Sequence, residues 1–191
     1  MIMRRWLATA ILALLLIGPG GPAWGHVTDV MPDAVAEMEY QILLDFQPDK
    51  VEVRNKLAMV LYRKKKFKEA EAEFRTVLAT APTNFDALDG LGLVMGRTAR
   101  TKEAISQFEA AIRVNAQDVM VHYHLGQALA GEGDLPAAAK SLARAAELAG
   151  QPTAVVSEAD RQAIRQAVAE TEQKLHPGAG PPAAGGATGP R

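Results

Sequence analysis

The feature that most constrains this chain is a set of apolar and small residues that returns every 34 residues. Within each period these residues fall at three- and four-residue steps and are divided by a short polar stretch, which is typical of two helices joined by a turn. A fixed period of this length indicates a stacked helical array rather than an ordinary globular core. The equivalent positions are Leu57, Leu91 and Leu125; Ala58, Gly92 and Gly126; Leu61, Met95 and Leu129; Ala70, Ala104 and Ala138; and Phe74, Phe108 and Leu142.

The period divides the chain into three complete units, residues 51–84, 85–118 and 119–152. Residues 33–48 form one more helical pattern, which Pro48 ends, and it matches the second half of a unit. Residues 153–176 contain a last amphipathic pattern, with Ser157 as the predicted N-cap. We expect this segment to be a capping helix that shields the final apolar face of the array.

At these residues the sequence resembles the tetratricopeptide repeat family, whose pattern is clearest in the middle unit. The resemblance covers residues 33–152 and implies an all-α fold, a right-handed α-solenoid of about three helix-turn-helix repeats with an N-terminal half-repeat. In the turns, Lys65 and Ala99 replace the glycine that the third unit keeps at Gly133, and they would be strained if the position needs a positive φ. The residues that carry the family pattern are Leu88, Leu91, Gly92, Met95, Ala104, Phe108 and Ala111.

The two ends of the chain read differently from the array. Residues 1–25 combine Arg4 and Arg5, an apolar run over residues 6–17 and small residues before His26, which is the pattern of a secretory signal peptide. We therefore expect cleavage after Gly25 and a periplasmic or secreted protein; an uncleaved N-terminal membrane anchor is the alternative. Residues 177–191 contain only Gly, Ala, Pro, one Thr and a final Arg, so they are predicted to be a disordered tail.

Composition excludes several classes of function. The chain has no cysteine, which removes disulfides, thiolate metal sites and cysteine nucleophiles. Its net charge is −1, and loss of residues 1–25 would make it −3, so it is no basic nucleic-acid binder. No catalytic triad order or nucleotide-binding loop occurs, and His122 and His124 point about 200° apart on a helix. We predict no enzyme activity, no cofactor and no metal.

The resemblance implies that the first helix of each unit lines a concave groove that holds a peptide or helix of a partner protein. Met59, Leu93 and the two tyrosines would make this groove partly apolar and adaptable. The predicted groove residues are Glu52, Asn55, Met59, Tyr62 and Arg63 from the first unit, Asp86, Asp89, Leu93 and Arg97 from the second, and Met120, Tyr123, Gln127 and Ala130 from the third.

Charge is spread unevenly near the start of the array. Residues 26–50 carry six acidic side chains and one basic, whereas residues 51–84 carry eight basic and four acidic, so we expect the two segments to pack together. The basic run over residues 63–68 reads as a solvated turn with Phe67 directed inward. The alternative is that Lys64, Lys65 and Lys66 contact an anionic membrane surface or an acidic partner.

Three classes of function follow from these observations. The leading hypothesis is a non-catalytic interaction module or scaffold in the cell envelope that binds a segment of another envelope protein. The second is a structural scaffold that self-associates through its end helices, with Ile164 and Val168 in the contact. The third, a hydrolase or metal enzyme, would need a polar cluster for which the sequence gives no motif.

Overall fold

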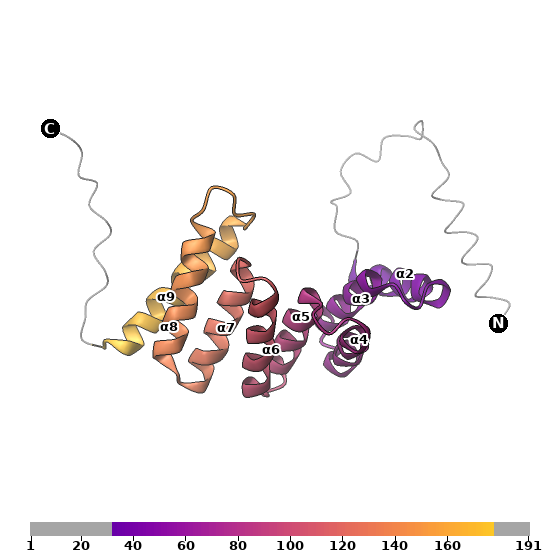
Figure 1. Ribbon diagram of the computed structural model, residues 1–191, viewed down its shortest axis with the longest axis horizontal. Coiled ribbons are helices and arrows are strands. Elements are labelled where there is room, and N and C mark those ends of the chain that lie inside the picture. The colour runs from indigo at the N-terminus through magenta and orange to yellow at the C-terminus, as the bar shows by residue number, and fades with distance from the viewer. Residues whose placement is uncertain (1–31, 178–191) are drawn as a thin grey trace.

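The structure of the protein is a computed structural model that describes residues 32–177. Across this range the chain is all-α, which confirms the predicted repeat solenoid (Figure 1). The predicted signal peptide, residues 1–25, and nearly all of the predicted tail, residues 177–191, lie outside the described residues. The helices are α2 (Asp33–Phe46), α3 (Val51–Arg63), α4 (Phe67–Thr80), α5 (Phe85–Arg97), α6 (Thr101–Val114), α7 (Val119–Glu132), α8 (Leu135–Ala149) and α9 (Glu158–Leu175).

The helices pack in chain order, so each one contacts mainly the helices next to it in the sequence. Pairs α3 with α4, α5 with α6 and α7 with α8 form the three repeats, and Figure 1 shows them as successive steps of an elongated array. The first helices also contact each other across repeats, α3 with α5, α5 with α7 and α7 with α9, whereas the second helices do not approach as closely. The array is therefore curved, with the first helices on its inner side.

Small residues in the first helices allow the aromatic side chains of the second helices to enter the core. A Cβ atom added at Gly92 would lie 2.5 Å from Cε1 of Phe108, and one at Gly90 would lie 2.2 Å from Cζ of Phe74. These distances are far below van der Waals contact, so both positions have to be glycine for the rings to pack as they do. Phe74 and Phe108 belong to one buried cluster that runs through the first two repeats into the third.

The turns inside the repeats share one backbone conformation. Lys65, Ala99 and Gly133 have φ angles of 61°, 59° and 86°, which place all three in the left-handed region. The condition under which Lys65 and Ala99 would be strained is therefore met. Only the third repeat has glycine at this position, which adopts the conformation without steric strain.

Ion pairs fix α2 against the first repeat. The Asp33 carboxylate lies 2.5 Å from the guanidinium of Arg63, and the Glu37 carboxylate contacts the ammonium groups of Lys64 and Lys66 at 2.5 and 2.7 Å. Hydrogen bonds from the two lysines hold the pKa of Glu37 below its ordinary value of 4.5. The acidic entry segment therefore packs beside the basic repeat, as the charge distribution predicted.

Apolar packing fixes α9 at the other end of the array. Ile164 is 1% exposed and lies in a buried cluster with Val119, Ala145 and Leu148. The prediction that Ile164 forms a self-association surface is therefore wrong, because its side chain is used to close the array. At the start of α9, the hydroxyl of Ser157 accepts a hydrogen bond from the backbone N–H of Asp160 at 3.1 Å, as expected of an N-cap.

Candidate functional site

The candidate site is the inner surface of the array, which α3, α5 and α7 form together because they approach one another across the repeats. The side chains of Met59, Tyr62 and Leu93 pack against the central core cluster and remain partly exposed. Tyr123 of α7 also remains partly exposed, and it packs against the second buried cluster, which contains Ile164 of α9. The inner surface is thus a partly apolar strip that continues from the first repeat to the third.

One repeat position links successive first helices, and it holds Asn55, Asp89 and Tyr123 in the three units. The amide of Asn55 donates a hydrogen bond to Oδ1 of Asn84, the N-cap of α5, at 2.8 Å. The carboxylate of Asp89 lies 2.9 Å from Nδ1 of His124 on α7. Tyr123 packs on the cluster that contains α9. Each side chain therefore joins its own repeat to the next element of the inner surface.

Asn55 does not belong to the exposed part of the groove, contrary to the prediction. Its side chain is 7% exposed, and its Oδ1 atom is buried without a hydrogen-bond partner. The position was predicted to face inward, and it does, but the amide is used between α3 and α5. Arg63, another predicted groove residue, extends to Asp33 instead of remaining free on the inner surface.

The remaining predicted groove residues lie at the surface of the first helices to different degrees. Met120 and Ala130 are partly exposed, and the charged or polar members are more fully exposed. The exposed members are Glu52, Asp86, Arg97 and Gln127. None of these is buried, and their part in binding stays a prediction.

The pair Asp89 and His124 was not predicted, although both residues were considered separately. They are 35 residues apart, so a side chain in one repeat meets a side chain one residue further along in the next repeat. Both side chains are mostly buried, at 17% and 15% exposure. A mostly buried polar pair therefore joins α5 to α7 beneath the otherwise partly apolar strip. Asp89 lies on the same helix as Leu93, and His124 lies on the same helix as Tyr123.

Two carboxylates of α9 act on Tyr123 at the C-terminal end of the inner surface. Burial raises the pKa of the Tyr123 phenol, and the nearby carboxylates of Asp160 and Glu170 raise it further. The phenol oxygen also accepts a hydrogen bond from the Gln127 side chain at 2.7 Å. The sequence predicted α9 only as a cap, whereas the structure places its carboxylates beside a predicted groove residue.

The basic turn between α3 and α4 is mostly used inside the molecule. Lys64 and Lys66 bond to Glu37, and the ring of Phe67 packs 5.8 Å from the ring of Tyr62. Lys65 is exposed at the tip of the turn. This arrangement agrees with a solvated turn whose phenylalanine is directed inward, and it leaves fewer free ammonium groups than the sequence suggested.

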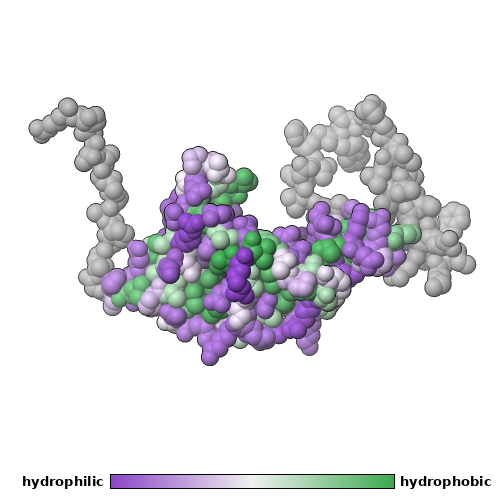
Figure 2. Space-filling view, in the orientation of Figure 1, coloured by the Kyte–Doolittle hydropathy of each residue, from purple (hydrophilic) through white to green (hydrophobic). Residues whose placement is uncertain are grey.

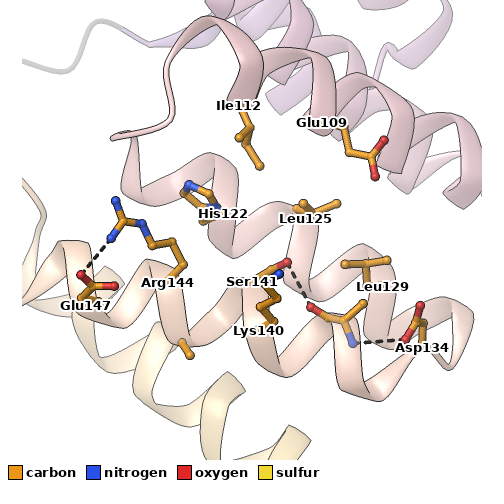
Figure 3. Close-up of a pocket in the computed structure, with 12 residues that line it drawn as sticks. Glu109, Ile112, His122, Leu125, Leu129, Asp134, Lys140, Ser141, Arg144 and Glu147 are labelled. Atoms are coloured by element: carbon orange, nitrogen blue, oxygen red, sulfur yellow. Dashed lines mark hydrogen bonds and ion pairs between the residues drawn. The ribbon is translucent and has the colours of Figure 1, made fainter.

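A hollow lies on the outer side of the array, between α6 and α8, and has a volume of about 670 Å³. Leu125 and Leu129 of α7 form its floor with Ile112 of α6 (Figure 3). Charged side chains surround it, among them Arg144, which pairs with Glu147 at 2.8 Å. Figure 2 shows the wider pattern, with hydrophobic surface over the middle of the array between hydrophilic residues at its edges.

This outer groove was not predicted from the sequence. Ala137, Ser141 and Ala143 line it on α8, whereas the equivalent residues one repeat earlier are the longer Glu103, Gln107 and Glu109. A change from long to short side chains at equivalent outer positions was the available signal. The groove mixes both signs of charge over an apolar floor.

The structure gives no other chemical site within residues 32–177. In this range no three or more His, Asp or Glu side chains converge as metal ligands would. The described helices also include none that has both the length and the apolar character needed to span a bilayer.

Known proteins share this sequence pattern and this geometry. A family model described as tetratricopeptide repeat matches residues 33–85 and 91–154. No curated protein is significantly similar in sequence. Among solved structures, the chain is similar to TTC0263, a thermophilic TPR protein of Thermus thermophilus, with a TM-score of 0.63, 21% identity and coverage of 75% of each chain.

Two further solved structures are similar over much of their length. One is the Yersinia enterocolitica type III secretion chaperone SycD in complex with a peptide of the translocator YopD; the TM-score is 0.61 at 18% identity, covering 66% of this chain and 95% of SycD. The other is MamA from Desulfovibrio magneticus RS-1, with a TM-score of 0.58 at 22% identity, covering 64% of this chain and 69% of that one. At these identities the likeness shows a shared fold.

Proposed function

The chain belongs to the tetratricopeptide repeat family, and we propose that it is a non-catalytic module that holds a segment of a partner protein on its inner surface. The observation that carries this proposal is the strip of partly exposed apolar side chains on three adjacent first helices. Met59, Leu93 and Tyr123 come from different repeats, and each is anchored in the core below it. An anchored side chain loses little conformational freedom when a ligand covers it.

The dimensions of the inner surface suit a short segment. Packed helices lie about 8–10 Å apart, so three first helices present a strip roughly 20 Å long. An extended segment of about six residues spans that length, and so does a helix of about four turns. SycD, which has the same fold, has been solved with a peptide of its translocator, and this supports peptide capture as a use of the fold.

The charge of the inner surface suggests which residue type the ligand carries at the end nearest α9. Asp160 and Glu170 of α9 lie near Tyr123, and Asp86 is exposed on α5. A ligand with apolar residues over Met59 and Leu93 and a basic residue toward α9 would complement both features.

The test of this proposal is site-specific photo-crosslinking with full-length protein in cells of its source. A photoreactive residue replaces Leu93 on the inner surface, and matched proteins carry it at Ala143 in the outer groove and at Ala72 on the exposed side of α4. We expect one partner to be crosslinked from position 93 and neither control position to yield it. Crosslinking of that partner from position 143 instead would assign binding to the outer groove and overturn the proposal.

A second variant separates binding from folding. Leu93→Glu places a charge in the apolar strip at a partly exposed position, so we expect loss of the crosslinked partner with unchanged helix content by circular dichroism. Retention of the partner by this variant would count against the inner surface.

We further propose that the module acts in the cell envelope after export, on the basis of the signal-peptide pattern in residues 1–25. Both tryptophans of the chain, Trp6 and Trp24, precede the expected cleavage site. Processed protein from the envelope fraction should therefore show no tryptophan fluorescence. Tryptophan emission from that protein would exclude cleavage after Gly25 and favour an N-terminal anchor.

A further inference from the structure

The N-terminal helix α2 has an apolar face that no described helix covers. Four of the six large hydrophobic residues that are exposed in residues 32–177 lie on it. Val35, Met38, Leu43 and Phe46 are 52%, 57%, 37% and 73% exposed. They are three to five residues apart, so they share one side of the helix, together with the partly exposed Ile42.

The repeat itself does not require these apolar residues. In α4, one period later, the positions of Val35, Met38 and Phe46 hold Glu69, Ala72 and Thr80, and all three are exposed to solvent. Stacking of one repeat on the next is therefore possible without large apolar residues at these places. The apolar face of α2 is an addition to the repeat pattern, and its energetic benefit has to come from another contact.

Leu43 gives a second reason that α2 lacks a partner. The equivalent residue in α4, Val77, is 1% exposed and belongs to the central core cluster, and α4 packs against both α3 and α5. α2 has no first helix of its own among the described residues, so Leu43 is left 37% exposed. Leu43 therefore adds to the apolar surface that α2 leaves exposed.

The charge on α2 defines which helix fits. α2 carries four acidic residues and no lysine or arginine. Asp33 and Glu37 are neutralised by the basic turn of the first repeat. Glu39 and Asp45 form no ion pair within residues 32–177. With about 3.6 residues per helical turn, Asp45 lies at one edge of the apolar face beside Met38, and Glu39 lies within the face between Phe46 and Leu43.

We propose that the apolar face of α2 is a docking site for an amphipathic helix of another protein, with lysine or arginine side chains beside its apolar stripe. The apolar stripe would cover Val35, Met38 and Phe46, and the basic residues would meet Glu39 and Asp45. This site is separate from the inner surface formed by α3, α5 and α7.

Two other occupants fit the observations less well. The other exposed large hydrophobic residues within 32–177, Val114 and Val155, are isolated, so a second copy of the chain would have to pair its α2 with this α2. That pairing would bring Glu39 and Asp45 against the same acidic residues of the second copy. An anionic membrane surface would repel a helix that has only acidic charges.

The experiment uses the full-length chain and a fluorescent 15-residue helical peptide of leucine and lysine, with a leucine and glutamate peptide as the control probe. Fluorescence anisotropy measures binding. We expect the lysine peptide to bind and the glutamate peptide to bind at least tenfold more weakly. Replacing two exposed apolar residues together, Met38→Ser with Phe46→Ser, should weaken binding of the lysine peptide by about tenfold.

Charge and position are tested by single variants. Asp45→Asn should weaken binding by a few-fold and reduce its dependence on salt. Val114→Ser, at an exposed residue of α6, should leave binding unchanged. Failure at α2 would leave the proposed use of the inner surface intact, because the two sites are tested by different variants.

Four results would overturn the docking site. They are equal binding of both peptides, loss of binding in Leu93→Glu but not in the α2 double variant, binding of the wild type to vesicles with 30% anionic lipid through α2, and a dimer in light scattering that the double variant abolishes. Circular dichroism of each variant confirms that the fold is kept, which is expected because every replaced α2 residue is exposed.

Discussion

The two ends of the array are finished in opposite ways. At the C-terminal end, α9 buries Ile164 against α7 and α8 and presents mainly polar residues to solvent. At the N-terminal end, α2 is attached through ion pairs and through Tyr40 and Leu44, which pack against the core, and it leaves Met38 and Phe46 exposed. A stacked array needs a polar outer face at its ends for solubility. Among the described helices only the α9 end has one, and this difference agrees with the docking site that we propose on α2.

Ile164→Ala tests the closed end and should have the largest effect. Its side chain is fully buried, so its truncation leaves a cavity and lowers the free energy of unfolding by about 2–4 kcal/mol. Urea denaturation followed by circular dichroism measures this change. An effect below about 0.5 kcal/mol, the usual range of surface changes, would mean that α9 is not an integral cap.

Acidification should detach α2, the open end of the array, before it detaches α9, the closed end. Ion pairs lower the pKa values of Asp33 and Glu37 from 3.8 and 4.5, so their stabilisation is fully present above those values and is lost as the pH falls through the folded-state values. Hydrogen exchange between pH 6 and pH 3, corrected for intrinsic rates, should show loss of protection in α2 before α9.

Glu37→Gln provides the control for the acid experiment. The amide cannot titrate, so α2 should be less protected at pH 6 and should change less on acidification. Simultaneous loss of protection in α2 and α9 in the wild type would show that the charged contacts do not control the open end.

A smaller contrast separates the turns of the first two repeats from that of the third. Lys65 and Ala99 adopt positive φ, so Lys65→Gly or Ala99→Gly should raise the free energy of unfolding by about 0.5–1 kcal/mol. Gly133→Ala should lower it by about 1 kcal/mol for the same reason. Thermal and urea unfolding measure both changes, and opposite signs are required.

The smallest effect on stability is expected at the open face itself. Phe46 is 73% exposed, so Phe46→Ser should change the free energy of unfolding by less than about 0.5 kcal/mol. The same variant should bind less of the apolar dye 1-anilinonaphthalene-8-sulfonate. A large loss of stability would show that Phe46 belongs to the core and would remove the contrast between the two ends.

The periodicity of the sequence was sufficient to predict the helices, their order and their pairing. Residues such as Ala104 and Phe108 must be small or large because of how two neighbouring helices pack, and such local demands repeat with the unit. The positive φ at Lys65 was predictable for the same reason, since Gly133 holds the equivalent place.

The candidate site was less predictable because its details depend on pairs of side chains from different repeats. Asn55, Asp89 and Tyr123 occupy one repeat position, yet each has a different partner. The burial of Asn55 could not be read from its own helix, because it depends on Asn84 at the start of α5. The outer groove depends in the same way on the space between α6 and α8, which only the assembled array defines.

The neighbour-to-neighbour packing has a mechanical consequence. Among the described helices, α2 has extensive contacts with α3 alone, whereas α9 contacts both α7 and α8. A force applied along the array should therefore peel helices away one at a time, beginning with α2. A helix bound to the apolar face of α2 would add contacts at the weakest point of the chain and raise the force at which the array starts to unravel.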